Sequence, residues 1–458
     1  MEALAPILLF ALVFALLLLG YPVALTLAGG SFAFALACAG LGIFDLDVLG
    51  FLPGRLYGIM ANQTLIAVPL FVFMGAMLER TRIAEQLLRA LSGLLGGLPG
   101  GLGLGVLLMG ALMAASTGIV GATVVTLGLM ALPNLLRQGY DPQLATGTIS
   151  ATGTLGQIIP PSIALVLLGD VLSNAYSQAQ LAQGVFAPKT VSIGDLFAGS
   201  LLPGAVLVAL YALYLVAVAT LRPQRAPARR QGGAESDAPT ATDLVRALLA
   251  PMSLILAVLG SILAGLATPT EAAGVGALGA VLLALGNRTL NRELLRSVCE
   301  STLKTTAMVF FILIGASVFA LVFRGLGGDV LVQGLFEGFP GGALSALAAV
   351  MLVIFLLGFV LDFIEITFVV IPVVGPGLLA LGIDPIWLGV LIAVNLQTSF
   401  LTPPFGFALF YLRGVTPRDI RTAAMYRGVV PFVALQLVLL MLLFAFPILA
   451  TWLPGALR

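Results

Sequence analysis

The sequence contains no histidine, and only two of its 458 residues are cysteines. The absence of histidine excludes catalysis that depends on a histidine base and removes the commonest zinc ligand. Cys38 and Cys299 lie far apart in unlike contexts, so we expect two buried thiols without a bridge. No GxSxG or HExxH segment is present. We therefore expect neither an enzyme nor an organic cofactor.

Charged residues are scarce as well. Lys, Arg, Asp and Glu make up 9% of the chain and hydrophobic residues 60%, whereas a soluble domain is about 25% charged. Runs such as Ile7–Leu19, Ala247–Leu266 and Val429–Leu443 carry no charge and approach the length of a membrane-spanning helix. They do not alternate as barrel strands do. The composition predicts an all-α polytopic membrane protein, and the net charge of +1 implies no nucleic-acid partner.

An internal repeat relates the two halves of the sequence. The segment PNLLRQGYDP at 133–142 matches PGLLALGIDP at 376–385, and Pro160-Pro161 matches Pro403-Pro404 in the same register. Between the halves, residues 222–243 are polar and rich in Pro, Gly and Ala, which is typical of a disordered linker. We therefore predict a first repeat over 1–221, a cytoplasmic linker over 222–243 and a second repeat over 244–458.

Each repeat is predicted to hold about five crossings and one re-entrant helical hairpin. The hairpins fall near 100–136 and 342–380, where Gly and Pro interrupt apolar sequence, and the helices after them are broken at the Pro-Pro pairs. In each repeat, three expected crossings precede the hairpin and one follows the broken helix. The expected crossings, broken helices included, lie near 4–20, 23–42, 63–79, 142–168, 198–221, 247–266, 270–286, 305–323, 385–411 and 429–451.

The distribution of basic residues supports this topology. With a cytoplasmic linker, only Arg55, Lys189, Arg324 and Arg458 of the 21 basic residues lie outside, as the positive-inside rule requires. The N-terminus lacks a basic region and a cleavage site, so we expect a retained first span rather than a signal peptide. An odd number of crossings per half inverts the second repeat. Inverted repeats with broken helices are typical of secondary transporters.

The Pro-Pro pairs free backbone carbonyls, because proline lacks an N–H and displaces the carbonyl four residues before it. The freed carbonyls are expected at Gly156 and Gln157 in the first repeat, and at Ser399 and Phe400 in the second. Hydroxyl and amide side chains surround both breaks. We therefore expect an ion site at each, since Na+ takes oxygen ligands; the alternative is a kink satisfied by Ser and Thr hydroxyls and water.

The expected hairpin tips carry polar groups. The first tip is small and hydroxyl-rich at Ser116 and Thr117, whereas the second holds Asp362 and Glu365, three residues apart. Intramembrane acids are functional candidates, although these two could instead cap the second arm. Two basic amphipathic pieces, 79–93 and 287–304, are expected to be interfacial helices. Glu271 is expected to stabilise a helix N-terminus.

Six stretches together resemble the large membrane subunit of tripartite ATP-independent periplasmic (TRAP) transporters. They span nearly the whole chain: GYPVALTLAG near the N-terminus, GQIIPPS, VSIGDLFAGSLLPG at 191–204, TPTEAAGVGAL at 268–278, LDFIEITFVVIP at 361–372 and TPPFGFALF at 402–410. The resemblance implies an elevator-type, Na+-driven importer of organic acids in the bacterial inner membrane. It also implies a small four-span membrane subunit and a periplasmic solute-binding protein as partners.

Similarity to divalent-anion/Na+ symporters implies one Na+ at each hairpin. Together with the hairpin tips, the expected Na+ ligands are Ser116, Thr117, Gly156, Ile159, Pro161, Gly358, Leu361, Ser399, Thr402 and Phe405. The expected substrate-binding residues are Thr152, Thr154, Asp362, Glu365, Asn395 and Thr398. Ser399 departs from the family, in which glycine is usual. About twenty extra residues, 171–190, are expected to form a longer outer loop or a contact with a partner.

Other functions fit less well. A stand-alone ion-coupled anion symporter would need no binding protein and remains the alternative transporter. A channel is disfavoured, because no filter sequence such as TVGYG is present and paired broken helices fit alternating access better.

Overall fold

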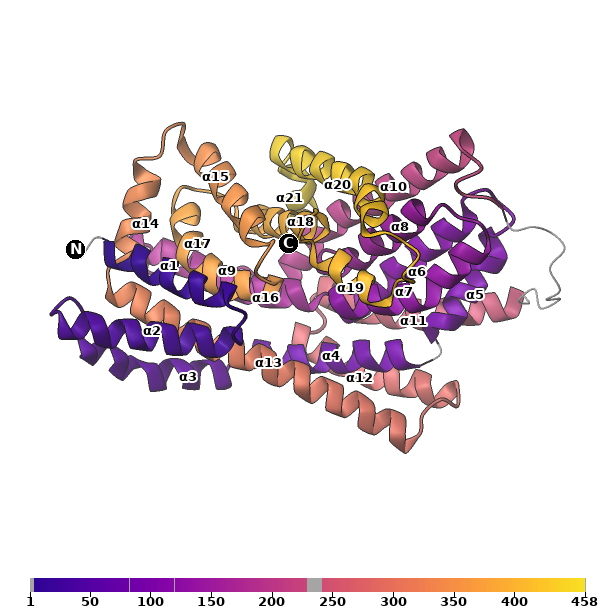
Figure 1. Ribbon diagram of the computed structural model, residues 1–458. Helices are drawn as coiled ribbons and strands as arrows, with labels where there is room; N and C mark the ends of the chain where they lie inside the picture. Colours follow the sequence, from indigo (N-terminus) through magenta and orange to yellow (C-terminus); the bar gives the residue numbers. More distant parts are fainter. Residues whose placement is uncertain (1–3, 82, 119, 229–240, 458) are drawn as a thin grey trace. The chain divides into compact units, whose positions relative to one another are not determined.

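The computed structural model describes residues 4–81, 83–118, 120–228 and 241–457, and all regular structure within these ranges is helical (Figure 1). The helices before the linker are α1 (Ala5–Leu18), α2 (Val23–Gly40), η2 (Leu46–Phe51), α3 (Leu52–Met60), η3 (Gln63–Ile66), α4 (Ala67–Arg80), α5 (Ile83–Leu95), α6 (Gly101–Thr117), α7 (Val120–Arg137), α8 (Pro142–Thr154), η4 (Leu155–Gln157), α9 (Ile163–Ala182) and α10 (Ile193–Leu221). Those after it are α11 (Ala241–Leu263), α12 (Pro269–Gly286), α13 (Arg292–Gly325), α14 (Gly328–Glu337), α15 (Gly342–Leu357), α16 (Phe363–Glu365), η5 (Ile366–Val370), α17 (Ile371–Ala380), α18 (Pro385–Leu401), α19 (Phe407–Val415), α20 (Thr422–Ala445) and α21 (Ile448–Leu457).

The chain forms two compact units, and each draws on segments from both sides of the linker. Unit 1 contains residues 1–66, 167–192 and 303–389, and unit 2 contains residues 67–166, 193–302 and 390–458. The compact units therefore do not coincide with the two sequence repeats. The repeat boundaries at 221 and 244 stay a prediction from the sequence.

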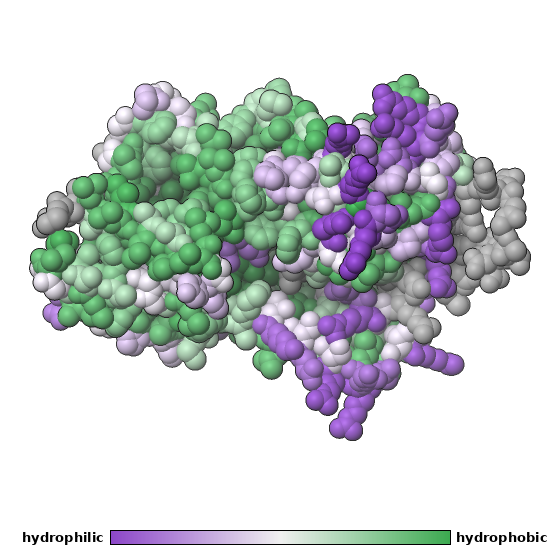
Figure 2. All heavy atoms as spheres, viewed as in Figure 1, coloured by the Kyte–Doolittle hydropathy of each residue, from purple (hydrophilic) through white to green (hydrophobic). Residues whose placement is uncertain are grey.

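Eight helical segments of the described chain are long and apolar enough to cross a membrane. In unit 1, the face that carries α1 and α2 is almost wholly hydrophobic (Figure 2), with Leu8, Leu25 and Leu36 about half exposed. An apolar surface of this extent contacts lipid or another protein rather than water, and the eight long apolar helices indicate lipid. The fold is therefore that of an all-α polytopic membrane protein, as the composition predicts.

The repeated Asp-Pro pairs begin the two broken helices in the same way. Gly139 and Gly382 adopt left-handed backbone angles, with φ of 83° and 86°, and end the preceding turn. The Asp141 carboxylate then accepts a hydrogen bond from the N–H of Gln143 at 2.8 Å, and Asp384 accepts from Ile386 at 2.9 Å. Proline follows at the first helical position, where no N–H is needed. The sequence repeat is thus also a repeat of local structure.

Both broken helices stop before their Pro-Pro pair, as expected. In the first repeat, α8 passes into η4 and the chain leaves helical geometry before α9 begins at Ile163. In the second, α18 ends at Leu401 and α19 starts at Phe407. The Pro160–Pro161 and Pro403–Pro404 peptide bonds are both cis.

The two expected hairpins are pairs of packed helices. In unit 2, α6 and α7 contact each other and meet at Gly118. In unit 1, α15 packs against the arm formed by α16, η5 and α17. Whether each hairpin enters and leaves on one side of the membrane stays a prediction.

Helix α8 is enclosed by other helices of unit 2, among them α6, α7, α19 and α20. Every residue from Leu144 to Thr154 is buried. Glycines make the contacts possible: a Cβ on Gly147 would lie 2.2 Å from the backbone oxygen of Gly428 on α20. On the hairpin side, Gly110 of α6 faces the Thr152 methyl, and Gly153 faces Val124 of α7. Small residues at such contacts let helix backbones approach closely in a membrane.

Three expectations about helical elements and one about a cysteine were wrong. The extra residues 171–190 are not simply a loop, since α9 continues to Ala182. The piece 287–304 is not a separate interfacial helix, because from Arg292 it forms the start of α13, which runs unbroken to Gly325. The last expected crossing, 429–451, is interrupted before α21 at Pro447. Cys299 is exposed rather than buried, whereas Cys38 is buried and both are free thiols.

The first residues of the linker are ordered against unit 2, which corrects the expectation of disorder for them. Ala226 is 1% exposed, and its carbonyl accepts a hydrogen bond from the N–H of Gly100 at 3.0 Å. Arg225 pairs with the Asp141 carboxylate at 3.4 Å and accepts from the Asp141 N–H at 2.9 Å. This segment joins the base of the first hairpin to the start of α8. Residues 229–240 lie outside the described chain.

Candidate functional site

The tip of the first hairpin lies against the break after α8. A Cβ built on Gly156 would lie 3.4 Å from the carbonyl oxygen of Ala114 and 3.6 Å from Cα of Gly118. Gly118 has a φ of 61°, and a Cβ on it would approach the backbone nitrogen of Ile163 to 2.8 Å. Glycine is therefore required at position 118, whereas a Cβ at position 156 would make only ordinary van der Waals contacts with the hairpin tip. Because no side chain separates the two segments, backbone oxygens of the tip and the break come close together.

The Gly156 carbonyl is not orphaned, which corrects one step of the sequence argument. The Ser162 hydroxyl, directly after the Pro-Pro pair, donates to this carbonyl at 2.7 Å. In the second repeat, the Ser399 carbonyl accepts from the N–H of Thr402 at 3.0 Å. The alternative reading, a kink satisfied by hydroxyl and backbone donors, therefore describes part of the geometry. The Ser162 oxygen still has lone pairs, since a donated hydroxyl remains an acceptor.

The residues expected at the first ion site are all in unit 2. Gly156 and Pro161 are buried, and Ile159 is half-buried. Ser116 and Thr117 are in the last turn of α6, but their side chains lie outside the described part of the structure. The described oxygens near the break include those of Ala114, Gly156 and Ser162 and the buried side-chain oxygen of Gln157. This neutral, oxygen-rich surrounding fits a hard monovalent cation.

The residues expected at the second ion site are divided between the units. Gly358 and Leu361 belong to unit 1, whereas Ser399, Thr402 and Phe405 belong to unit 2. Within unit 2, the Thr402 hydroxyl donates to the Thr398 carbonyl at 2.7 Å, and Phe405 is 65% exposed. The second site therefore stays a prediction.

Four of the expected substrate-binding residues line the interior of unit 2. Thr152, Thr154, Asn395 and Thr398 are each at most 2% exposed. The Thr398 hydroxyl donates to Val394 within its own helix, at 2.7 Å. The Thr152 methyl packs against Gly110, so this side chain fills the contact between α8 and the hairpin. Their burial gives these side chains a packing role in this structure, and contact with substrate stays a prediction.

The two hairpin acids of unit 1 form a capping box. Asp362 precedes the helical arm, and its carboxylate accepts from the N–H of Phe363 at 2.7 Å. Glu365 reaches back and accepts from the N–H of Asp362 at 3.0 Å. Such a box satisfies N–H groups that a helix start leaves unpaired. Asp362 is exposed and Glu365 half-buried, so both are at the surface of unit 1. Glu271 forms a similar box with Thr268, as expected.

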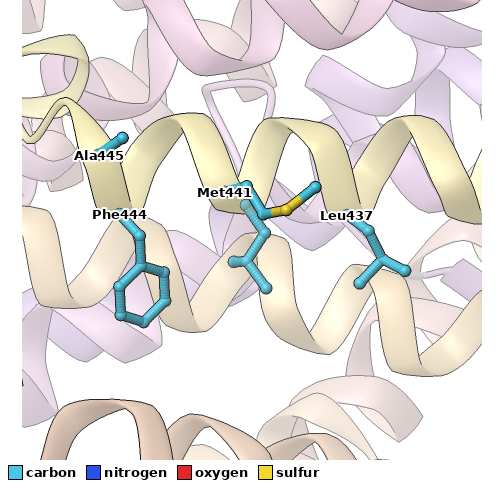
Figure 3. Close-up of a pocket in the computed structure, with 5 residues that line it drawn as sticks. Leu437, Met441, Phe444 and Ala445 are labelled. Atoms are coloured by element: carbon cyan, nitrogen blue, oxygen red, sulfur yellow. The ribbon is translucent and has the colours of Figure 1, made fainter. Parts of the chain in front are cut away.

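An apolar pocket runs along α20 of unit 2 (Figure 3). Its lining residues are Leu437, Leu440, Met441, Phe444 and Ala445, all from this one helix. A binding site for a polar solute needs polar groups that fix orientation, and none of these side chains supplies one. Met441 is 63% exposed, as expected for a lipid-facing position. We therefore place the candidate site at the hairpin and the break.

Several polar residues of the interior were missed by sequence reasoning. Ser162 bonds the Gly156 carbonyl, and Tyr211 and Gln436 are fully buried in unit 2. A signal was available, because glutamine within an apolar run is costly in a membrane and therefore needs a partner. The partners themselves come from distant parts of the chain and could not be read from the sequence.

These features define a helical membrane transport protein: packed helices with apolar surfaces, a helical hairpin at a broken helix, and the same Asp-Pro and Pro-Pro elements twice. Residues 10–449 match the family described as the tripartite ATP-independent periplasmic transporter, DctM component. The chain belongs to this family and is a large permease subunit of a TRAP transporter.

Individual relatives agree with this assignment. The chain is 28% identical to a C4-dicarboxylate TRAP transporter large permease protein of Vibrio cholerae, covering 98% of this chain and 97% of that protein. It is 30% identical to the corresponding Pseudomonas aeruginosa protein, covering 90% and 91%. Among solved structures, the Alcanivorax borkumensis YdaH transporter superposes with a TM-score of 0.64 at 17% identity, covering 88% and 89%. The last similarity concerns the fold alone.

Proposed function

We propose that the protein is the transport subunit of a Na+-coupled importer. In this proposal it carries a small organic acid across the bacterial inner membrane, and a periplasmic binding protein delivers the acid to it. A small four-span membrane subunit completes the complex. The observation that carries the proposal is the contact between the first hairpin tip and the break at Gly156. There the Ser162 hydroxyl bonds the Gly156 carbonyl, and the Ala114 carbonyl oxygen lies 3.4 Å from where a Gly156 Cβ would be.

The coupling argument rests on these oxygens. Na+ binds oxygen ligands, and carbonyl and hydroxyl groups at a helix break supply them without burying a second charge. Binding there would hold the hairpin tip against the broken helix, because the ion would take ligands from both. Occupancy of the site would then be linked to the position of the hairpin.

The substrate class is inferred from the named relatives. Similar proteins are named as permeases for C4-dicarboxylates, ectoine and sialic acid. Two of these three are acids at neutral pH, and we propose a small carboxylate for this chain. The alternative is a stand-alone ion-coupled anion symporter that needs no binding protein.

Uptake in proteoliposomes tests the proposal. The complex would be reconstituted with both partners, and uptake of a radiolabelled C4-dicarboxylate measured first. We expect uptake only with the binding protein present and an inward Na+ gradient imposed. Full uptake driven by a proton gradient alone would overturn the coupling, and equal uptake without the binding protein would favour the stand-alone symporter.

A further inference from the structure

Four buried polar side chains from four helices of unit 2 form what we call the polar junction: Thr154 on α8, Tyr211 on α10, Gln397 on α18 and Gln436 on α20. Each is 0% exposed. Gln397 Nε2 donates to the Thr154 hydroxyl at 3.3 Å. The Tyr211 ring packs on Phe432, one turn before Gln436 on α20, and its hydroxyl lies near the amides of Gln397 and Gln436. The junction therefore joins helices from both repeats.

Several polar atoms of the junction are left unmatched. Within the described chain, the Tyr211 hydroxyl, Gln397 Oε1 and both polar atoms of the Gln436 amide have no hydrogen bond of good geometry. Each buried unsatisfied group costs about 1–3 kcal/mol. Folded proteins commonly satisfy such groups with an ordered internal water, which makes about three hydrogen bonds.

The balance of donors and acceptors fits a water molecule. Gln397 Oε1 and Gln436 Oε1 are acceptors, the Gln436 NH₂ is a donor, and the Tyr211 hydroxyl can be both. One water can accept from Tyr211 and donate to the two glutamine oxygens, while the Gln436 NH₂ donates to the Tyr211 oxygen. Exchanging the oxygen and nitrogen of the Gln436 amide would not change this balance, because the side chain still offers one acceptor and one NH₂ donor.

A cation fits the same groups less well. The junction contains no carboxylate, and a cation among these atoms would face the Gln436 NH₂ or the proton of Tyr211. Both donors would have to turn away from it, leaving them unsatisfied in the interior. The chemistry of the junction therefore selects a neutral ligand with two protons and an acceptor.

We propose that one ordered water molecule binds at the polar junction and bridges Tyr211, Gln397 and Gln436. The water links α18 of the second repeat to α10 of the first, next to the direct contact between α8 and α18. This site differs from the ion site at Gly156 and requires neither ion nor substrate. It stabilises unit 2 in every state in which these four helices stay packed.

Thermal unfolding of the purified full-length chain in detergent tests this site. Tyr211→Phe and Gln436→Met would be compared singly and together, with Tyr214→Phe as the matched control. Tyr214 is on the same helix and packs against the same Phe432 ring at the same centroid distance of 5.1 Å, but it is half-buried and outside the junction. The design therefore separates loss of the junction from loss of a ring hydroxyl.

Each single variant is expected to lower the midpoint by about 2 °C or more, and the control by less than about 1 °C. The unfolding temperature of the double variant should fall by clearly less than the sum of the two single decreases, because removing both sides of a buried bridge leaves fewer unsatisfied groups. Additive losses, or Tyr211→Phe behaving like Tyr214→Phe, would overturn the proposal.

A high-resolution map of the parent complex gives the direct test. A density peak within hydrogen-bond distance of Tyr211 Oη and Gln397 Oε1 is expected, and it should vanish in Tyr211→Phe. A well-resolved junction without such a peak would contradict the proposal. A cation would show itself in the salt dependence of thermal unfolding. If NaCl but not choline chloride raises the unfolding temperature of the parent protein, and Tyr211→Phe removes this effect, the junction binds a cation and the water proposal is wrong.

Discussion

Gln397 donates a hydrogen bond to Thr154 at 3.3 Å, and these two residues occupy equivalent positions in the two repeats. Residues related by an approximate two-fold axis can touch their own equivalents only beside that axis. The predicted inverted repeat would therefore have its axis beside this pair. A sequence repeat alone could not locate this point.

Thr154→Val should destabilise the protein, because it leaves the buried Gln397 amide without its acceptor. The expected cost is about 1–3 kcal/mol. Thr148→Val on the same helix is the matched control, since its hydroxyl bonds only the Leu144 carbonyl within α8. Thermal unfolding in detergent should show a larger loss for Thr154→Val; equal losses would mean that the contact between repeats adds nothing.

Gly428→Ala should prevent close packing of α20 on α8. Its Cβ would lie 2.1 Å from the backbone oxygen of Gln143, which cannot move without displacing α8. Gly260→Ala is the control, because a Cβ there meets nothing within 4 Å and alanine favours a helix. We expect poor yield or a strongly lowered midpoint for the first variant, and an unchanged or raised midpoint for the second. A normal Gly428→Ala protein would contradict the packing argument.

Ser162→Ala should weaken ion coupling. The hydroxyl bonds the Gly156 carbonyl beside the hairpin tip, so its loss removes one oxygen from the proposed ion site. The Na+ concentration for half-maximal uptake is expected to rise about tenfold, or about 1.4 kcal/mol. Ser200→Ala removes a buried hydroxyl that bonds only within α10, and should leave this value unchanged. An unaltered Na+ dependence in Ser162→Ala would exclude Ser162 from the site.

Asp362→Asn separates a transport role from capping. Asparagine is as good an N-cap as aspartate, so the midpoint of unfolding should stay that of the parent. If the charge acts on ion or substrate, uptake should fall at least tenfold, about 1.4 kcal/mol. Glu365→Gln is expected to do less, because it lies further into the arm. Parent-like uptake by both variants would leave these acids a capping role only.

Thiol labelling tests the predicted topology, and the structure supplies better positions than the sequence. Cys299 is exposed and predicted to be cytoplasmic, so it should react only from inside. In a Cys299→Ser background, Phe186→Cys should react only from the periplasm, because Phe186 is 95% exposed on the predicted outer side. Gln180, on the same predicted outer side, is less suitable for a cysteine substitution, because its side-chain amide makes two hydrogen bonds to the backbone of Lys189. Labelling of Cys299 from the periplasm, or of Phe186→Cys from the cytoplasm, would contradict the predicted orientation and, with it, the assignment of the two hairpins.

Local signals predicted much of the fold. Asp-Pro at a helix start, glycine before it and Pro-Pro at a helix end act within a few residues, so their structure follows from sequence at once. The extension of α9 was missed because its Gln, Ser and Ala residues indicated a loop, whereas in the structure polar side chains of this stretch bond carbonyls of their own helix, as Asn174 does to Asp170 at 3.0 Å. Ser162 could have been noticed as a hydroxyl beside freed carbonyls. The polar junction could not, because its members come from helices far apart in the chain.

The burial of α8 has a consequence for biosynthesis. Gly147 of α8 packs against Gly428 of α20, and Gly428 comes later in the chain by more than half of its length. When α8 leaves the ribosome, α20 has not yet been made, and the hydroxyls of Thr146, Thr148, Ser150, Thr152 and Thr154 face whatever surrounds the nascent protein. Those bonded to their own backbone carbonyls, such as Thr148 and Thr154, can be accommodated in lipid from the start. The final enclosure of α8 must therefore be a late, post-insertion step, and a nascent chain arrested before residue 428 should leave this helix accessible to proteases or lipid-soluble probes.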